Sequence, residues 1–439
     1  GAMIRIARTG SGFEWEPLLT SFGFKGGCVD ELWQTAALLE GHSGTRAVGL
    51  GVQSVLWSDA AVFASCSPPA GNAMMYLLTE YALRKAREIP FDTPMELLSE
   101  LYPLVYAYGK SVTGNPRLRA TFALNALVAV DNAAWLLYCR ENAIESFDML
   151  IPASMRPALS CRHRKLAAVP LISYGNTPQD AAGMLDQGFF FLKIKIGSDP
   201  EGDADPEKML AWDMRRLSAI HALARDRSTR YTENGYIPYY LDANGRYGSK
   251  DQLLRLLDYA DHIGALERII LLEEPFPEEY RVDVSDIPVR IAADESAHCD
   301  RDALERIELG YGAIALKPIA KTLSMSLRIA QTAHERGVPC FCADLTVNPV
   351  LVDWNKNVAA RLAPLPGMKV GVLETIGQQN YRNWRRMQSY HPCCGAPWMQ
   401  VKEGLFALDD DFYRRSGGIF GQMKHYESLA NGGSVWQDT

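Results

Sequence analysis

"GFFFLKIKIG", residues 188–197, is the stretch of sequence that decides the fold. Its aromatic and β-branched residues, with a glycine at each end, predict a buried β-strand. Lys193 and Lys195 lie two positions apart inside it, so a strand directs both side chains to the same face. Two ammonium groups on one face of a buried strand need either opposite charges beside them or a chemical role.

Similar short apolar stretches recur along the chain after residue 165 and alternate with amphipathic segments. Most follow one another at intervals of about 20–30 residues, the length of one strand–helix unit. Eight such units predict a closed (β/α)8-type barrel rather than an open sheet. One longer interval contains Arg225–Tyr240, which we expect to be an inserted surface loop. The expected strands are Val169–Tyr174, Phe190–Ile196, Tyr239–Asp242, Ile269–Glu273, Val289–Asp294, Ala313–Lys317, Val338–Asp344 and Lys369–Glu374.

The residues before this region follow a different pattern, which is typical of an α+β module. Ala47–Trp57 predicts a strand, whereas Gly71–Glu88 and Thr121–Glu141 predict helices. The last of these helices is apolar on almost every side, so we expect it to be buried. Its single acid, Asp131, is interpreted as a hydrogen-bonded core residue in preference to a contact between domains.

Composition excludes several classes of protein. The 439 residues carry a net charge of −7, which argues against a general nucleic-acid binder. Because no uninterrupted apolar run of about 18 residues occurs, we expect no membrane span. The nine scattered cysteines favour a reducing, cytoplasmic location over a disulfide scaffold. The pairs at 340/342 and 393/394 lack partner pairs at zinc-site spacing, so we expect free thiols there.

Nearly every expected strand ends in an ionisable residue. One such residue is usually a helix cap or a solvated loop residue. In a parallel barrel, however, all carboxyl ends of the strands meet at one mouth, where active sites are built. The series therefore predicts a charged site at that mouth. Its members are Lys193, Lys195, Asp242, Glu273, Glu274, Asp294, Glu295, Lys317, Asp344 and Glu374.

Three carboxylates from three successive strands predict a cation site. Asp242, Glu273 and Asp294 would repel one another unless a cation lay between them. Carboxylate oxygens are the ligands that Mg²⁺ prefers, and Mn²⁺ accepts a similar set. We favour Glu273 over its neighbour Glu274 on strand phase, with an uncertainty of one residue.

The lysines predict acid–base chemistry. Lys193 beside Lys195 would lower the pKa of Lys195, whose neutral amine could then remove a proton, while Lys317 arrives from the opposite side of the barrel. An amine next to a cation suits removal of the proton beside a carboxylate, through an enediolate. That intermediate may be reprotonated on its other face, lose a β-leaving group or arise from ring opening. Alternatively, the lysines only form salt bridges with the carboxylates.

This set of motifs resembles the enolase superfamily, and within it the muconate-lactonizing-enzyme-like subgroup of the mandelate racemase/muconate lactonizing enzyme family. The resemblance covers roughly residues 165–375 and depends on the order of "KIK", "LDANG", "EEP", "ADES" and "ALKP", while "ALVAVDNAAW" resembles the last helix of the family's capping domain. It implies a modified TIM barrel, (β/α)7β, at residues 161–380 behind an N-terminal α+β capping domain at residues 4–160. We expect residues 381–439 to be a tail that packs on the barrel or on the capping domain.

The resemblance also implies roles for single residues. It implies Mg²⁺ on Asp242, Glu273 and Asp294, with Lys195 and Lys317 as acid–base residues and Lys193 beside them. A capping-domain loop within Phe13–Cys28 would close the mouth. Assembly into a homo-oligomer is implied too, with a small carboxylate as substrate and neither nucleic acid nor membrane as partner. Further candidates for substrate contact or support are Phe22, Phe24, Lys25, Asn244, Glu274, Glu295, His298, Asp344 and Glu374.

The departures from the family narrow the function. The seventh strand ends in Asp344 and the sixth carries Lys317, whereas the mandelate-racemase-like branch has a histidine and an aspartate there. The leading hypothesis is therefore a Mg²⁺-dependent isomerase, either a racemase/epimerase or a cycloisomerase. The alternatives are a hydroxy-acid or acid-sugar dehydratase, a metal-independent Schiff-base lyase and a non-catalytic binding barrel.

Overall fold

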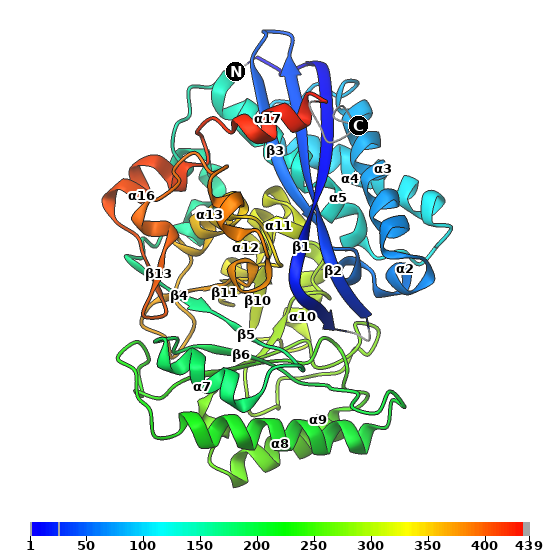
Figure 1. The fold of residues 1–439 in the computed structure, drawn as a ribbon. Coiled ribbons are helices and arrows are strands. Elements are labelled where there is room, and N and C mark those ends of the chain that lie inside the picture. The colour runs from blue at the N-terminus through cyan, green and yellow to red at the C-terminus, as the bar shows by residue number, and fades with distance from the viewer. Residues whose placement is uncertain (1, 25–26, 433–439) are drawn as a thin grey trace.

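The computed structural model describes residues 2–24 and 27–432, which form an N-terminal sheet with its helices above a barrel (Figure 1). The sheet is antiparallel with strand order β1–β2–β3. Its strands are β1 (Ile6–Phe24), β2 (Gly27–Gly41) and β3 (Arg46–Gln53). The two long strands β1 and β2 run from the outer edge of the sheet down toward the barrel (Figure 1).

Helices cover one face of this sheet. Ser67 and Thr93 cap the two longest surface helices, α3 and α4, and a proline follows each cap at the first helical position. The helices are α1 (Val55–Ser58), α2 (Ala60–Ser65), α3 (Pro68–Ala86), α4 (Pro94–Thr113), α5 (Ala120–Glu141) and α6 (Phe147–Leu150), followed by the 3₁₀ helix η1 (Ala153–Leu159).

Helix α5 is the one helix in the described part of the chain that is long and apolar enough to cross a membrane. It is a core helix, however, because 94% of its most apolar window is buried inside the protein. Asp131 within it accepts hydrogen bonds from the backbone N–H and the hydroxyl of Ser324, at 3.0 and 2.6 Å. Ser324 lies in a barrel helix, so the interpretation of Asp131 as a plain core residue is incomplete: it also joins the two parts of the molecule.

The barrel contains all eight expected strands, in parallel and in chain order. Pro170 divides the first into β4 (Lys165–Val169), which pairs with the last strand, and β5 (Leu171–Ile172), which pairs with the second. Because proline has no backbone N–H to donate to a neighbouring strand, it interrupts the first strand at this point. The two halves of the first strand then pair with the last and the second strand, which closes the barrel. The other strands are β6 (Leu192–Lys195), β7 (Tyr239–Asp242), β8 (Ile269–Glu273), β9 (Ile291–Ala293), β10 (Ala313–Leu316), β11 (Cys340–Cys342) and β12 (Gly371–Glu374).

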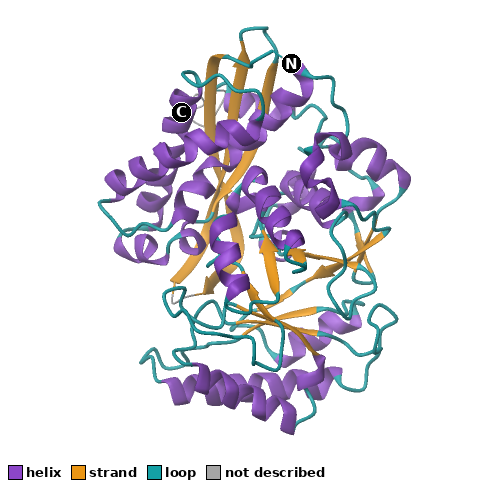
Figure 2. Cartoon of the chain, turned by 180° about the vertical axis from the view of Figure 1, so that it is seen from behind, coloured by secondary structure: helices purple, strands orange, loops and turns teal. Residues whose placement is uncertain are grey.

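Helices connect most of these strands on the outside of the barrel (Figure 2). Thr177 and Asp180 form a capping box at the start of α7, and Asp205 caps α8. The connecting helices are α7 (Pro178–Asp186), α8 (Pro206–Ala224), α9 (Lys250–His262), η2 (Leu266–Arg268), α10 (Asp300–Glu308), α11 (Pro318–Lys321), α12 (Leu323–Glu335) and α13 (Pro349–Ala359).

The C-terminal tail contacts both parts of the molecule. Strand β14 pairs antiparallel with β4, and a Cβ on Gly404 beside it would lie 2.5 Å from the carbonyl oxygen of Gly188, so only glycine allows this approach. Helix α17 lies across the N-terminal sheet (Figure 1), where His425 contacts Glu14 at 2.7 Å. The tail contains α14 (Gly377–Asn380), α15 (Trp384–Gln388), η3 (Pro397–Met399), β13 (Val401–Lys402), β14 (Leu405–Ala407), α16 (Asp410–Arg415), η4 (Ser416–Gly418) and α17 (Lys424–Ala430).

Two expected elements differ in the structure. The strand expected at Ala47–Trp57 ends at Gln53, and helix α1 follows, because the polar pair at 53–54 interrupts the apolar run. The closing loop expected within Phe13–Cys28 is strand on both sides of residues 25–26, because β1 and β2 pair from Ile6 to Pro17 and again from Phe22 to Phe24, with an irregular stretch between them. The inserted segment Arg225–Tyr240 pairs with Met368, before β12, and therefore lies away from the barrel mouth.

Candidate active site

The first row of the site follows from the register of three neighbouring strands. Lys195 pairs with Asp242, and Asp242 pairs with Glu273, so these three side chains end β6, β7 and β8 at one level. All three are buried. Because parallel strands put their carboxyl ends at the same edge, one cation and two acids converge at the barrel mouth.

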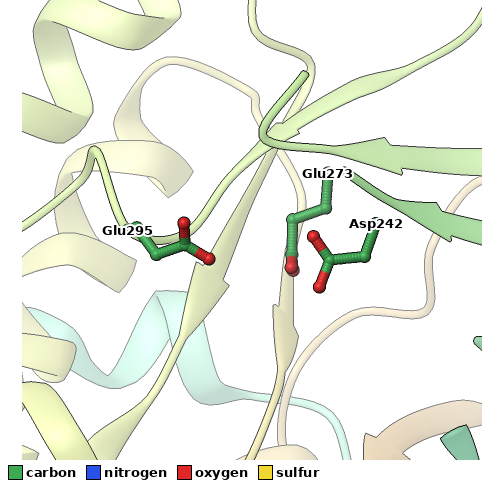
Figure 3. A group of neighbouring side chains, drawn as sticks. All are labelled: Asp242, Glu273 and Glu295. Carbon is green, nitrogen blue, oxygen red and sulfur yellow. The ribbon is translucent and has the colours of Figure 1, made fainter. Parts of the chain in front are cut away.

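A group of three carboxylates at this edge could hold a metal ion. Ligand oxygens of Asp242, Glu273 and Glu295 all lie within 4.8 Å of one another (Figure 3). Burial and the nearby Asp242 carboxylate raise the pKa of Glu273 well above its usual value. One oxygen of Glu273 is buried without a hydrogen-bond partner among the described residues. These are the donor set and the charge conflict that a hard divalent cation resolves.

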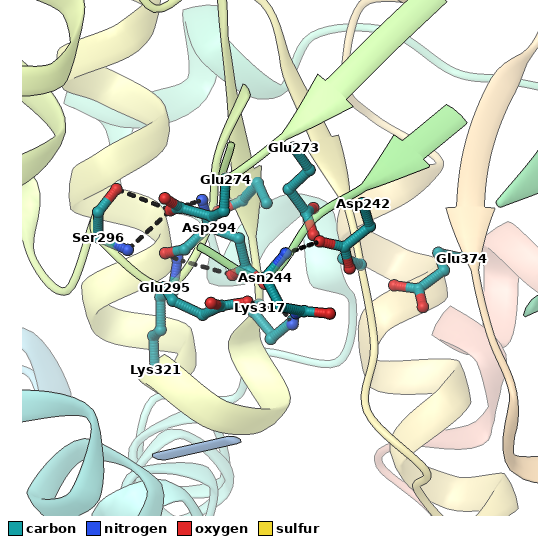
Figure 4. Close-up of polar contacts among 12 residues, drawn as sticks. Asp242, Asn244, Glu273, Glu274, Asp294, Glu295, Ser296, Lys317, Lys321 and Glu374 are labelled. Atoms are coloured by element: carbon teal, nitrogen blue, oxygen red, sulfur yellow. Dashed lines mark hydrogen bonds and ion pairs between the residues drawn. The ribbon is translucent and has the colours of Figure 1, made fainter. Parts of the chain in front are cut away.

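Asp294, the third predicted ligand, lies in a different environment. Its carboxylate accepts from Lys317 Nζ at 2.5 Å and lies 3.2 Å from Lys321 Nζ (Figure 4). Burial opposes its charge, but the two lysines outweigh burial and lower the pKa of Asp294. Strand β9 ends at Ala293, so strand alternation no longer fixes the direction of the next two side chains. The structure therefore brings Glu295, rather than Asp294, to Asp242 and Glu273.

Glu274 is turned away from this carboxylate group. One of its oxygens accepts from the backbone N–H groups of Asp294 and Ser296 and from the Ser296 hydroxyl, at 2.7–2.8 Å (Figure 4). Its φ of +42° lies in the left-handed region that favours glycine, which turns the chain sharply after Glu273. Burial and the Glu295 carboxylate raise the pKa of Glu274 to about 7.

Lys193 is held in an ion-pair network. Its Nζ lies 3.0 Å from Glu374, 3.3 Å from Asp242 and 3.8 Å from Glu273. Burial opposes its charge, but Glu374, Glu273 and Asp242 together raise the pKa of Lys193 well above its usual value. Lys193 thus remains protonated in this arrangement, and the salt-bridge alternative describes it better than an acid–base role does.

Lys195 and Lys317 approach the site from opposite sides of the barrel, since three strands separate β6 from β10. Lys195 Nζ donates to the side-chain oxygen of Asn244 at 2.9 Å, and the amide of Asn244 donates to Glu295, also at 2.9 Å. Burial opposes the charge of Lys317, but Asp294, Glu374 and Glu273 together outweigh burial and raise the pKa of Lys317.

A chamber of about 380 Å³ opens over both lysines. Barrel residues form its floor, and segments of β1, β2, β3 and α1 form its wall. Asp344 and Glu374 line it, and burial together with the charge of Glu374 raises the pKa of Asp344 well above its usual value. The wall residues from the N-terminal part include Leu18, Val29, Asp30, Glu31, Leu32, Gln53, Ser54, Val55, Leu56 and Trp57.

Comparison with known proteins now identifies the family. Residues 177–366 match the family described as enolase C-terminal domain-like. A mandelate racemase/muconate lactonizing protein from Herpetosiphon aurantiacus has the same fold, with a TM-score of 0.64, 16% identity, and coverage of 92% of this chain and 96% of that one. Residues 177–366 belong to the enolase C-terminal domain-like family. The chain as a whole has the fold of the mandelate racemase/muconate lactonizing protein, and its N-terminal α+β part is the capping region of that fold.

Two other structural neighbours of the chain carry functional names. One is a dipeptide epimerase from Enterococcus faecalis V583 complexed with Mg and the dipeptide L-Leu-L-Tyr, with a TM-score of 0.60, 16% identity and coverage of 87% and 92%. The other is an N-succinyl Arg/Lys racemase from Bacillus cereus ATCC 14579, with a TM-score of 0.59, 16% identity and coverage of 87% and 89%. No curated protein sequence matches the chain.

The other residues predicted for the site are His298, Phe22, Phe24 and Lys25. His298 contacts Glu278 at 2.7 Å and is not among the residues that line the chamber. Phe22 and Phe24 belong to β1, where they pair with Val29 and Gly27, but their side chains and all of Lys25 lie outside the described residues.

Of the chamber wall, the sequence analysis predicted only the segment Phe13–Cys28, to which Leu18 belongs, and it did not predict the other capping residues, Trp57 among them. The one usable signal was the polar Gln53–Ser54 pair, which marks the end of β3.

Proposed function

We propose that this protein is a magnesium-dependent isomerase that inverts the carbon beside a carboxylate, as a racemase or epimerase does. The observation that carries the proposal is the position of Lys195 and Lys317, which line one chamber from opposite sides of the barrel. Inversion requires an acid–base group on each face of the reacting carbon, whereas a cycloisomerase or a dehydratase needs only one.

The carboxylate group supports the cation. Asp242, Glu273 and Glu295 would hold it, and the buried Glu273 oxygen that accepts no hydrogen bond from the described residues is the feature that fits it best. Bound there, Mg²⁺ would supply Lewis acidity that stabilises negative charge on the substrate carboxylate. The neighbour complexed with Mg is a dipeptide epimerase, which supports the choice of metal.

The lysines divide the proton transfers. In one direction Lys195 accepts the proton of the α-carbon, whose electron pair is delocalised into the carboxylate. The Lys317 ammonium, kept charged by Asp294, then donates a proton to the opposite face. In the reverse direction the two lysines exchange roles. The ordered contact of Lys195 with Asn244 fixes its position for this step.

A chiral assay of candidate acids tests this function. Dipeptides and N-acyl amino acids of both configurations come first, because the named neighbours are an epimerase and a racemase of such compounds. We expect inversion of at least one acid with Mg²⁺, loss of inversion with EDTA, and loss in both Lys195→Gln and Lys317→Gln. No inversion of any acid, under conditions where an authentic dipeptide epimerase is active, would overturn the proposal.

Dehydration of a hydroxy acid is the second candidate, and Asp344 is the observation that favours it. This carboxyl is 2% exposed and lines the chamber. Burial and Glu374 keep its pKa high, so it can protonate a departing hydroxyl group. Release of 2-keto acids from acid sugars, lost in Asp344→Asn, would replace inversion as the assigned reaction.

The other two alternatives have less support. A Schiff-base nucleophile must be a neutral amine, whereas carboxylates raise the pKa of both Lys193 and Lys317 against the effect of burial. A binding barrel has no need for lysines on both sides of a carboxylate group. All nine cysteines are free, as suits the cytoplasmic location that we propose for this enzyme.

A further inference from the structure

Trp57 places the capping region directly on one of the two proposed acid–base lysines. Lys317 Nζ lies 4.5 Å from the centroid of the Trp57 ring. Trp57 is 3% exposed and lines the same chamber as Lys317. It comes from helix α1, whereas Lys317 follows β10 of the barrel. An ammonium group over an indole face is attracted by the π electrons, most strongly where water is excluded.

The Trp57 segment is fixed by a set of hydrogen bonds to the core helix α5. The backbone N–H of Ser54 and the hydroxyl of Ser58 both donate to the side-chain oxygen of Asn125, at 2.8 and 2.9 Å. Thr121 donates to the carbonyl of Ser58 at 2.6 Å, and Asn125 donates to the carbonyl of Val52 at 2.9 Å. All four bonds are buried or partly buried, so they hold α1 and the residues before it in place.

The Trp57 ring and the Asp294 carboxylate both lie beside the Lys317 ammonium. Asp294 accepts from Nζ at 2.5 Å, and Lys321 in turn donates to the backbone carbonyl of Asp294 at 2.7 Å. Trp57 Nε1 has no hydrogen-bond partner among the described residues, so the ring contributes its face and not its N–H group. The lysine nitrogen thus lies beside one fixed carboxylate and one fixed aromatic ring.

Lys195 is held differently. Its Nζ contacts Asn244 at 2.9 Å and lies 5.8 Å from the ring centroid of Tyr174. These two residues belong to the barrel.

We propose that Trp57 is a positioning residue for Lys317, through which the capping region controls proton transfer on one face of the substrate. This proposal rests on the proposed function for its catalytic consequence, but not for the contact itself. It predicts that loss of the ring impairs the Lys317 half of the reaction and spares the Lys195 half. A merely structural role for Trp57 would weaken both halves together.

Exchange of the α-proton in D₂O, measured from each enantiomer separately, tests the catalytic consequence. Lys317→Gln first shows which enantiomer depends on Lys317. In Trp57→Leu we expect exchange of that enantiomer to fall about 30-fold relative to the other, the upper end of a desolvated cation–π contact. Trp57→Phe keeps an aromatic face and loses no hydrogen bond, so its proton exchange should be close to that of wild type. This variant also replaces Trp57→Leu in the test if Trp57→Leu does not fold.

Trp135→Phe is the matched control. Trp135 is a buried tryptophan of the same capping region, and its Nε1 donates to Ser324 of the barrel at 3.0 Å. Its substitution should change exchange of the two enantiomers equally. Equal losses in Trp57→Leu would overturn the proposal.

Chemical labelling tests the contact without catalysis. Acetic anhydride labelling of Lys317, followed by peptide mass spectrometry, should become at least threefold faster in Trp57→Leu, with Lys195 as internal reference and Trp135→Phe unchanged. Unchanged labelling of Lys317 would overturn the proposal. If no acid exchanges its proton at all, the proposed function fails, and the labelling result alone then decides the role of Trp57.

Discussion

The Lys193 ammonium forms an ion pair with Glu374 at 3.0 Å, across the line where the barrel closes. Lys193 belongs to the second strand and Glu374 to the last, and both side chains are almost completely buried. The sequence pattern places Lys193 beside Lys195 as a modulator of its pKa. The structure assigns Lys193 instead to balancing three carboxylates, those of Glu374, Asp242 and Glu273.

Removing this charge should destabilise the protein strongly. Lys193→Met leaves buried carboxylates facing one another, so we expect the free energy of unfolding to fall by about 3–5 kcal/mol. Urea unfolding followed by circular dichroism measures it. Lys165→Met, at an exposed lysine that begins β4, should change stability by less than about 0.5 kcal/mol. A loss in Lys193→Met as small as that control would contradict the assignment.

Magnesium binding should depend on Glu273 and not on its neighbour Glu274. We expect Glu273→Gln to weaken Mg²⁺ binding by more than about tenfold in calorimetric titrations. Glu274→Gln keeps the oxygen that accepts from Asp294 and Ser296, so it should bind Mg²⁺ normally. Equal effects of the two substitutions would mean that the carboxylate group is not a selective cation site.

The third carboxylate of the site can be identified in the same titration. The structure brings Glu295 to Asp242 and Glu273, while Asp294 is bound by two lysines. Glu295→Gln should therefore lower Mg²⁺ affinity more than Asp294→Asn does. If Asp294→Asn, at matched secondary structure by circular dichroism, has the larger effect, the third ligand is the one that the sequence motif "ADES" predicts.

Asp131 should make the stability of the protein depend on pH. Burial raises its pKa to about 6, against an ordinary value of 3.8. Because the pKa of Asp131 is higher in the folded state than in the unfolded state, its contribution to the free energy of unfolding is complete below about pH 4. That contribution is lost as the pH rises through about 6. Relative to wild type, Asp131→Asn should thus gain about 3 kcal/mol between pH 4 and pH 7. Urea unfolding of both proteins at the two pH values measures the difference. If the free energies of unfolding of wild type and Asp131→Asn change equally between these pH values, Asp131 does not titrate in this range.

The sequence predicts much of the barrel because each strand carries its own local signal. Short apolar runs that end in an acid or a lysine are readable one at a time, and parallel topology brings their ends together. The alternation of side-chain directions along a strand stops being a guide just past the strand ends. Beyond Ala293, alternation no longer operates, so Asp294 and Glu295 could not be told apart.

The contacts between distant segments could not be predicted. Trp57 meets Lys317 across 260 positions, and β14 pairs with β4 from the far end of the chain. No local pattern encodes such pairings, because each depends on how the finished domains dock. The closing loop expected within Phe13–Cys28 came from the family resemblance alone, and no local pattern predicted the pairing of β1 with β2 there.

Proton exchange in the two single-lysine variants tests the central claim most directly. With Mg²⁺ in D₂O, wild type should exchange the α-proton of both enantiomers of its substrate. Lys195→Gln should retain exchange from one enantiomer only, and Lys317→Gln from the other only. If either variant loses exchange from both enantiomers while still binding Mg²⁺, or retains both, the lysines do not serve opposite faces of the substrate, and the account is wrong.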